Sequence, residues 1–220
     1  MDIETRQIIL ASASPRRLEI LRAHGIEPVV IVPEVDEEEL AASLWGGLEP
    51  QELAQQLAME KARVVYELIR DDASGLPGSL VTQNTFILAA DTIVCSKELG
   101  VLGKPTDHAD AVRMLLALCN TAHEVITGVA AIELATGKRD SLADLTTVHF
   151  REYGLSEIEE YLVCEPPFDK AGSYAIQGMW SKQVGLVEGD LENVIGLPHY
   201  RLCELLNNQY CYLPAMPTKP

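Results

Sequence analysis

A serine, a proline and two arginines stand where a short apolar segment gives way to an amphipathic one. Ser14 and Pro15 are typical of the first positions of a helix, and Arg16 and Arg17 follow them directly. A helix N-terminus carries partial positive charge, so arginines there cost a few tenths to about 1 kcal/mol unless an anion binds. The pattern therefore indicates a phosphate site, although two solvated arginines explain the segment equally well when it is taken alone.

An aspartate interrupts the most apolar run of the chain. Asp91 lies within residues 86–94 with apolar neighbours on both sides, and a carboxylate buried there needs a cationic partner or a metal ion. An aspartate that caps a turn at a strand end is the alternative, but the apolar run continues through Val94. By position, Asp91 is the strongest candidate for a catalytic residue.

Other charged and amide side chains could complete a site for a phosphorylated ligand. Lys104 follows the apolar run of residues 86–94 after a short connection and could contact phosphate. Lys61 lies on a long predicted helix, where lysines usually face solvent. The acidic stretch 34–39 offers oxygen ligands for a hard divalent cation, although a surface loop is the commoner meaning of such a run. Residues 170–178 combine a lysine, two glycines that let backbone approach a ligand, and an amide able to read a base edge. Neither a Walker A pattern nor G-x-G-x-x-G is present, so phosphate binding of those kinds is not indicated.

The elements that must position these groups alternate between helix and strand, with a β-rich middle. Hydrophobic periodicity predicts strands over residues 8–11, 29–32, 86–94, 124–134 and 142–151. It predicts helices over residues 15–23, 50–70, 107–118, 156–163 and 198–206, with Ser156 and Glu159 forming a capping box. Residues 135–138 suit a hairpin connection between the last two strands. This order favours an α/β, or mixed α+β, fold with a central mixed sheet flanked by helices.

Length and charge limit the ligands that this protein can bind. At 220 residues, 47% of them hydrophobic and 23% charged, the chain predicts one domain over residues 1–207, with two lobes, and a loose tail over 208–220. Its formal net charge of −16 argues against a nucleic-acid polymer as partner, because such binding depends on a basic surface. A few cations that converge in one cleft, helped by a divalent metal, can still hold a small phosphorylated ligand.

Two further patterns bear on the compartment. No apolar run approaches the roughly 18–20 residues needed to span a bilayer, and the first residues do not resemble a signal peptide. We therefore expect a cytoplasmic protein with no membrane partner. The five cysteines are widely spaced without a C-x-x-C pair, which predicts reduced thiols that take no part in the site.

Short motifs, taken in order, resemble the Maf family over residues 8–206. These motifs are LASASPRR (10–17), EKA (60–62), ADTIV (90–94), GKP (103–105), HEVITGV (123–129), KAGSY (170–174), QG (177–178) and NVIGLP (193–198). Each is weak alone, and their order and spacing carry the resemblance. It implies a homodimer of mixed α/β fold with a nucleotide cleft between two lobes. The activity implied is hydrolysis of nucleoside triphosphates between the α and β phosphates, with Mg²⁺ or Mn²⁺ as cofactor.

The resemblance also implies roles for the charged residues. Asp91 becomes the catalytic acidic residue, with Glu37 as its metal or water partner and both as ligands of the metal. Arg17, Lys61 and Lys104 become a clamp for the triphosphate. The reaction implied is metal-assisted attack of water on the α-phosphorus.

A second group of residues concerns the base and the rest of the substrate. Arg16, Thr92 and Gln177 match the positions that mark the Maf branch acting on dTTP and UTP. Ser12 and Lys170 complete the expected substrate-binding set.

Two alternatives stay open at this point. Met179 and Trp180 replace small residues beside Gln177, so a pyrophosphatase for 7-methyl-GTP or another modified nucleotide is one alternative. The other is a nucleotide-binding regulator of cell division, which would need the cleft but not Asp91. The chain departs from the Maf pattern at one more place: His199 and Tyr200 follow Gly-Leu-Pro, where the family usually has an aliphatic residue.

Overall fold

The computed structural model describes residues 7–44, 47–71 and 84–210, apart from the side chains of residues 37, 38, 42 and 207–210. The described residues form one open, mixed seven-stranded sheet in the order β2-β1-β3-β5-β6-β7, with β4 paired to β3. The strands are β1 (Gln7–Leu10), β2 (Val29–Val30), β3 (Thr85–Ser96), β4 (Gly100–Leu102), β5 (Ala122–Glu133), β6 (Arg139–Phe150) and β7 (Val184–Glu188). The helices are α1 (Pro15–Ala23), α2 (Glu37–Leu44), α3 (Pro50–Arg70), α4 (His108–Leu118), α5 (Leu155–Cys164), α6 (Leu191–Ile195) and α7 (His199–Tyr210), with 3₁₀ turns η2 (Ala171–Ser173) and η3 (Met179–Gln183).

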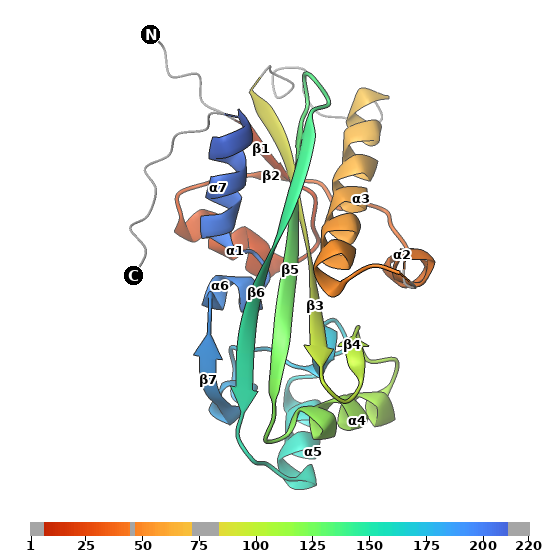
Figure 1. Cartoon of the computed structure of the whole chain (residues 1–220), viewed down its shortest axis with the longest axis vertical. Coiled ribbons are helices and arrows are strands. Elements are labelled where there is room, and N and C mark those ends of the chain that lie inside the picture. The colour runs from red at the N-terminus through yellow and green to blue at the C-terminus, as the bar shows by residue number, and fades with distance from the viewer. Residues whose placement is uncertain (1–6, 45–46, 72–83, 211–220) are drawn as a thin grey trace.

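Three long strands connect the two lobes. β3, β5 and β6 pair antiparallel and run nearly the full length of the molecule (Figure 1). In one lobe β1 extends the sheet in parallel, α3 covers one face, and α1 and α7 cover the other. In the other lobe α4 and α5 pack with the far ends of the same strands. The mixed α/β fold predicted from the sequence is confirmed.

Side chains along β3 alternate between the two faces of the sheet. Leu88 and Ala90 pack with residues of α1 and α7, whereas Ala89 packs with residues of α3. Because successive side chains of a strand point to opposite faces, Asp91 faces α3 and Thr92 faces α1. One strand therefore presents a carboxylate to one helix and a hydroxyl to the other.

Gly128 allows α3 to lie very close to the sheet. It pairs with Asp91 in the register of β3 and β5, and a Cβ atom at this position would come within 2.2 Å of the Ala54 backbone. Any side chain here would push α3 away. The close approach brings Lys61, two helical turns beyond Ala54, within reach of Asp91.

The acidic stretch is not a surface loop throughout. α2 begins at Glu37, and Asp36 precedes it with its Oδ1 accepting a hydrogen bond from the Glu39 backbone N–H at 3.0 Å. Aspartate is a favoured N-cap residue. Helix initiation therefore explains part of this acidic run, and the loop interpretation is wrong from residue 37 onward.

The predicted start of α5 is also wrong by one residue. The helix begins at Leu155, and the Glu157 carboxylate accepts a hydrogen bond from the Gly154 backbone N–H at 3.1 Å. Ser156 and Glu159 therefore do not form the capping box, because Ser156 already lies inside the first turn. Glu159 instead pairs with His108 of α4 at 2.9 Å.

Other predicted boundaries fare differently. α3 has the predicted bounds, the strand expected over 29–32 is shortened to β2, and α7 continues through residue 210, so residues 208–210 of the expected tail are helical. Residues 72–83 and 211–220 lie outside the described residues. In the described part of the chain, no helix combines the length and the apolar character needed to cross a membrane.

Candidate active site

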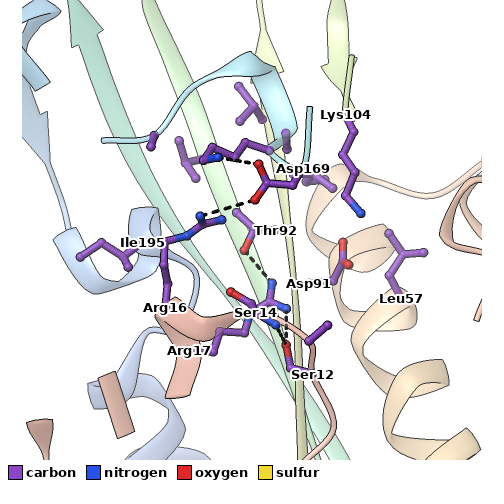
Figure 2. A pocket seen from close by; sticks show the side chains of 18 of the residues that line it. Ser12, Ser14, Arg16, Arg17, Leu57, Asp91, Thr92, Lys104, Asp169 and Ile195 are labelled. Atoms are coloured by element: carbon purple, nitrogen blue, oxygen red, sulfur yellow. Dashed lines mark hydrogen bonds and ion pairs between the residues drawn. The ribbon is translucent and has the colours of Figure 1, made fainter. Parts of the chain in front are cut away.

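A cavity of about 940 Å³ opens beside the middle of β3. Figure 2 shows Asp91 and Lys104 on one side of it, and Arg16, Arg17 and Thr92 on the other. The side chain of Glu37 lies outside the described residues. The predicted site residues that line the cavity are Ser12, Arg16, Arg17, Lys61, Asp91, Thr92, Lys104, Lys170 and Gln177.

Asp91 and Lys61 form a short ion pair at the wall of the cavity. Lys61 Nζ lies 2.5 Å from Asp91 Oδ1, and the two side chains are 5% and 13% exposed. Burying either charge alone would be costly, so each offsets the desolvation of the other. Asp91 keeps the larger exposed fraction, so this oriented carboxylate is accessible to a water molecule in the cavity.

Arg17 is held in place from three parts of the chain. Its guanidinium donates to the Gly196 carbonyl at 2.9 Å, to Ser12 Oγ at 3.1 Å and to Thr92 Oγ1 at 3.3 Å. Ser14 stands at the N-cap position of α1 without a side-chain capping bond, and its backbone N–H donates to Ser12 Oγ at 3.1 Å. Ser14 therefore takes the helix-start position that the pattern predicts, but its hydroxyl does not cap the helix. The two arginines do lie in a first turn without acidic residues, where an anion would be stabilised.

A carboxylate on the rim of the cavity organises two more cations. Asp169 lies 3.8 Å from Arg16 Nη1 and 2.5 Å from Lys170 Nζ. Burial raises the pKa of Asp169, but the hydrogen bond and charge of Lys170, together with the charge of Arg16, outweigh it and lower the pKa overall. Asp169 was not predicted from the sequence. Nothing local marks it, because its role depends on α1 reaching a loop about 150 residues away in the chain.

The cavity thus combines the Asp91–Lys61 ion pair with several further cations, an arrangement that suits an anionic ligand and attack on it by water. The sequence profile described as Maf-like protein matches residues 7–209. The chain belongs to the Maf family. It is 42% identical to the dTTP/UTP pyrophosphatase of Symbiobacterium thermophilum over 202 residues, covering 91% of this chain and 93% of that protein. It is 40% identical over 206 residues to the protein of that name from a Geobacter species, covering 93% and 95% of the two chains. The corresponding protein of Bacillus cereus is 41% identical over 197 residues, covering 90% and 92%.

The two residues beside Gln177 that depart from the family pattern, Met179 and Trp180, do not line the cavity of this Maf protein. Trp180 is fully buried and packs against Tyr153 and Tyr161 in the core of the second lobe. Neither Trp180 nor Met179 lines the cavity, whereas Gln177 does and is exposed to it. The Met179 backbone N–H donates to the carboxylate of Glu165, which anchors this loop.

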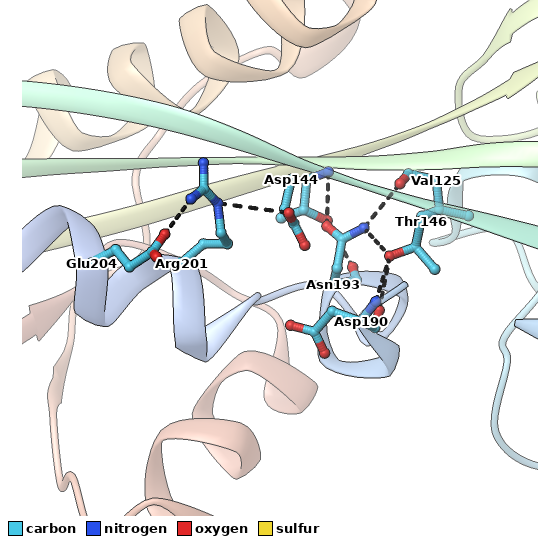
Figure 3. Close-up of polar contacts among 8 residues, drawn as sticks. Val125, Asp144, Thr146, Asp190, Asn193, Arg201 and Glu204 are labelled. Carbon is cyan, nitrogen blue, oxygen red and sulfur yellow. Dashed lines mark hydrogen bonds and ion pairs between the residues drawn. The ribbon is translucent and has the colours of Figure 1, made fainter. Parts of the chain in front are cut away.

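A buried asparagine lies at the centre of a group of polar contacts that joins α6 to β5 and β6 (Figure 3). Asn193 is fully buried; its Oδ1 accepts from the Thr127 backbone N–H at 3.2 Å, and its carbonyl accepts from Thr127 Oγ1 at 2.8 Å. Its Nδ2 donates to the Val125 carbonyl and to Thr146 Oγ1, both at 2.9 Å. The Thr127 hydroxyl also bonds the Thr92 hydroxyl at 3.0 Å. Asn193 therefore ties α6 to β5 and β6 and supports the hydroxyl that Arg17 contacts.

This network leads to a prediction about stability. We expect Asn193→Ala to lower the free energy of unfolding by roughly 2–4 kcal/mol, because it leaves several buried donors and acceptors without partners. Gln55→Ala is the control, since Gln55 is half-buried and accepts one hydrogen bond, from Ser141 Oγ; it should cost less than about 1 kcal/mol. Urea unfolding followed by circular dichroism measures both. Equal losses in the two variants would show that the Asn193 contacts contribute no more to the free energy of unfolding than the single hydrogen bond of Gln55.

The cavity also offers oxygen ligands for a hard cation. Among the described residues, the carboxylates that line it are Asp36, Asp91 and Asp169. Asp169 uses both of its carboxylate oxygens in the pairs with Lys170 and Arg16, whereas the pair with Lys61 uses Oδ1 of Asp91, so Asp91 is a better donor than Asp169. Carboxylate oxygens are the ligands that Mg²⁺ and Mn²⁺ prefer. The four cysteines in the described part of the chain are free thiols that do not line the cavity. Cys211 lies outside the described residues.

Proposed function

We propose that this Maf protein hydrolyses dTTP and UTP to the nucleoside monophosphate and pyrophosphate. The observation that carries the proposal is the Asp91–Lys61 pair, at 2.5 Å, in the wall of a cavity whose lining also contains four further cationic side chains. The names of the relatives at 40–42% identity support the choice of substrate. Water attacks the α-phosphorus, and pyrophosphate leaves.

The cations position the triphosphate and stabilise charge on it. Arg17 is already oriented by its contacts to Ser12, Thr92 and Gly196, so little side-chain freedom is lost when a phosphate binds beside it. Lys61 and Lys104 line the Asp91 side of the cavity and stabilise the negative charge that develops on the leaving pyrophosphate. A protein of net charge −16 needs this local excess of cations to hold a triphosphate.

Asp91 acts on the water. Its ion pair with Lys61 holds one carboxylate oxygen, while the other remains to accept a hydrogen bond from the attacking water. In this position Asp91 orients the water and takes its proton as attack proceeds.

A divalent cation completes the proposed site. We place Mg²⁺ or Mn²⁺ on Asp91 and Glu37, with Asp36 as the neighbouring carboxylate that the described structure supports as a donor. When bound, such an ion polarises phosphoryl oxygens and neutralises part of their charge.

Base recognition is proposed for Arg16 and Gln177. Both line the cavity and come from its two sides, α1 and the loop before η3. The Thr92 hydroxyl already contacts Arg17 and Thr127, which leaves it one further hydrogen bond for a ligand. A site that pairs with the polar edge of uracil or thymine rejects a base that leaves its polar groups unpaired.

Gln177→Ala is therefore expected to reduce base selectivity more than the maximal rate. The ratio of kcat/KM for dTTP over GTP should fall by about tenfold, because one hydrogen bond to the base is lost. Gln56→Ala, an exposed glutamine of α3 that does not line the cavity, is the matched control and should leave the ratio unchanged. An unaltered ratio in Gln177→Ala would remove this residue from base recognition.

A turnover panel separates this function from its alternatives. The substrates are dTTP, UTP, CTP, GTP, 7-methyl-GTP and methylated pyrimidine triphosphates, compared by kcat/KM. We expect dTTP and UTP to lead by orders of magnitude over purine nucleotides. Preference for 7-methyl-GTP or a methylated pyrimidine would favour a modified-nucleotide pyrophosphatase, and binding without turnover would favour a regulator of cell division.

We further propose that the protein is a cytoplasmic homodimer. The Maf family match supports the dimer. Light scattering of the purified protein tests the dimer, and a mass of one chain, 24.1 kDa, would contradict it.

A further inference from the structure

A histidine cluster lies behind α1, apart from the cavity. His24 follows the last residue of α1, Glu192 lies on α6 and His199 is the first residue of α7. Each offers one nitrogen or oxygen atom, and these atoms all lie within 4.8 Å of one another. None of the three residues lines the cavity. We refer to these three residues as the His24 cluster.

The contacts within the His24 cluster are close. His24 Nε2 lies 2.7 Å from Glu192 Oε1. The imidazole rings of His24 and His199 stack with centroids 3.5 Å apart and planes 5° from parallel. His199 is 5% exposed, whereas the side chains of His24 and Glu192 are 28% and 33% exposed. One ligand is therefore held in the core, and two lie where an ion can reach them from solvent.

We propose that the His24 cluster binds one divalent transition-metal ion, most suitably Zn²⁺. Two imidazoles and one carboxylate are a donor set that zinc uses in proteins, with a fourth position left for water or another ligand. Nitrogen ligands favour zinc, cobalt and nickel over Mg²⁺, which prefers oxygen. The ion that suits this cluster therefore differs from the ion proposed for the cavity.

The geometry requires only a small adjustment to bind zinc. Tetrahedral ligands at about 2.1 Å lie roughly 3.4 Å apart. Donor atoms up to 4.8 Å apart must therefore approach by up to about 1.4 Å, and His24 Nε2 and Glu192 Oε1, now 2.7 Å apart, must separate slightly. The stacked rings direct their lone pairs in parallel planes, and His24 must turn about its outer torsion for both to point at one ion. Its exposure leaves room for that turn. Cys203, one turn along α7, places its Sγ 3.5 Å from His199 Nε2 and is a further possible donor.

A metal ion here would join α1, the helix that carries Arg17, to α6 and α7. The ion would tie the end of α1 to α6 and to the start of α7. The hydrogen bond from Arg17 Nε to the Gly196 carbonyl links α1 to the same α6–α7 connection. Bound zinc would therefore stabilise the folded protein, because the scattered ligands of the unfolded chain bind it weakly.

The test compares four proteins stripped of metal and then dialysed against Zn²⁺ with Mg²⁺ in excess, so that oxygen-rich sites hold Mg²⁺. They are the wild type, His24→Ala, Glu192→Gln and the control His149→Ala, in which an exposed histidine paired with Glu188 at 2.6 Å is removed. Bound zinc is counted by elemental mass spectrometry, and thermal unfolding is recorded with and without zinc. The two ligand variants alter partly exposed side chains, so their fold can be checked directly by circular dichroism.

We expect one zinc per chain in the wild type and in His149→Ala, and an affinity at least about 100-fold weaker in His24→Ala and Glu192→Gln. With zinc about a hundred-fold above its dissociation constant, the melting temperature should rise by about 5–10 °C in the first two proteins only. Co²⁺ in place of zinc should give visible absorption bands of a tetrahedral nitrogen and oxygen site, and a thiolate band if Cys203 joins it. Absence of stoichiometric zinc in the wild type, or equal retention in all four proteins, would overturn the proposal.

Discussion

Asp91→Asn is expected to lower kcat/KM for dTTP by about 10²–10⁴-fold while the circular dichroism spectrum stays that of the wild type. The amide keeps the shape of the side chain but cannot take a proton from water, and it removes a negative charge from the proposed metal site. The pair with Lys61 at 2.5 Å shows that this carboxylate is already oriented, so little of the loss would come from misplacement. Steady-state kinetics at saturating Mg²⁺ measures the effect.

The stability of this variant should change as well. Neutralising a carboxylate that is buried without a partner would stabilise the folded protein. Asp91, however, is paired with Lys61, whose side chain is only 5% exposed. We therefore expect a loss of about 1–3 kcal/mol in the free energy of unfolding. Asp144→Asn is the matched control, because Asp144 is a half-buried strand aspartate outside the cavity, and burial, then Asp190, already raise its pKa. Wild-type activity in Asp91→Asn would exclude Asp91 as the catalytic residue.

Chelation of divalent metal is expected to reduce turnover to below about 1% of its initial value. A triphosphate carries several negative charges, and the cavity contains three aspartates among its described lining residues, so repulsion must be offset. Treatment with EDTA followed by dialysis should abolish turnover, and addition of Mg²⁺ or Mn²⁺ should restore it. Full activity in thoroughly chelated protein would contradict the proposed mechanism.

The same experiment separates the cavity from the His24 cluster. If Mg²⁺ alone restores turnover to chelated protein, the activity depends on the oxygen-rich site and zinc at the His24 cluster is structural. His24→Ala should then respond to EDTA and Mg²⁺ as the wild type does, because His24 does not line the cavity. A loss of Mg²⁺ rescue in this variant would mean that the two sites are coupled.

Local pattern was enough to predict the long helices and strands of this fold, but not the shorter elements α2, α6, β4 and β7. The apolar spacing of α3 gave its bounds at Pro50 and Arg70, and the apolar run of β3 singled out Asp91. Both features depend on residues near in sequence. Strand alternation then explains why Asp91 and Thr92 serve opposite sides of the cavity.

Contacts between distant segments could not be predicted in this way. Asp169 became part of the site only because α1 brings Arg16 to it, and Asn193 became a structural centre only because α6 docks against β5 and β6. The start of α5 was misjudged because a serine followed by a glutamate fits a capping box, although Gly154 and Glu157 make the actual contact. Propensity does not decide between two overlapping caps when the surrounding packing selects one.

The most direct test of the proposed chemistry is hydrolysis of dTTP in water enriched in oxygen-18, with product analysis by mass spectrometry. Attack on the α-phosphorus breaks the bond between that phosphorus and the bridging oxygen, so dTTP and water give dTMP and pyrophosphate, and the heavy oxygen enters dTMP. We predict one labelled oxygen in dTMP from each turnover and none in pyrophosphate. Label in pyrophosphate, or release of dTDP and phosphate, would contradict the account.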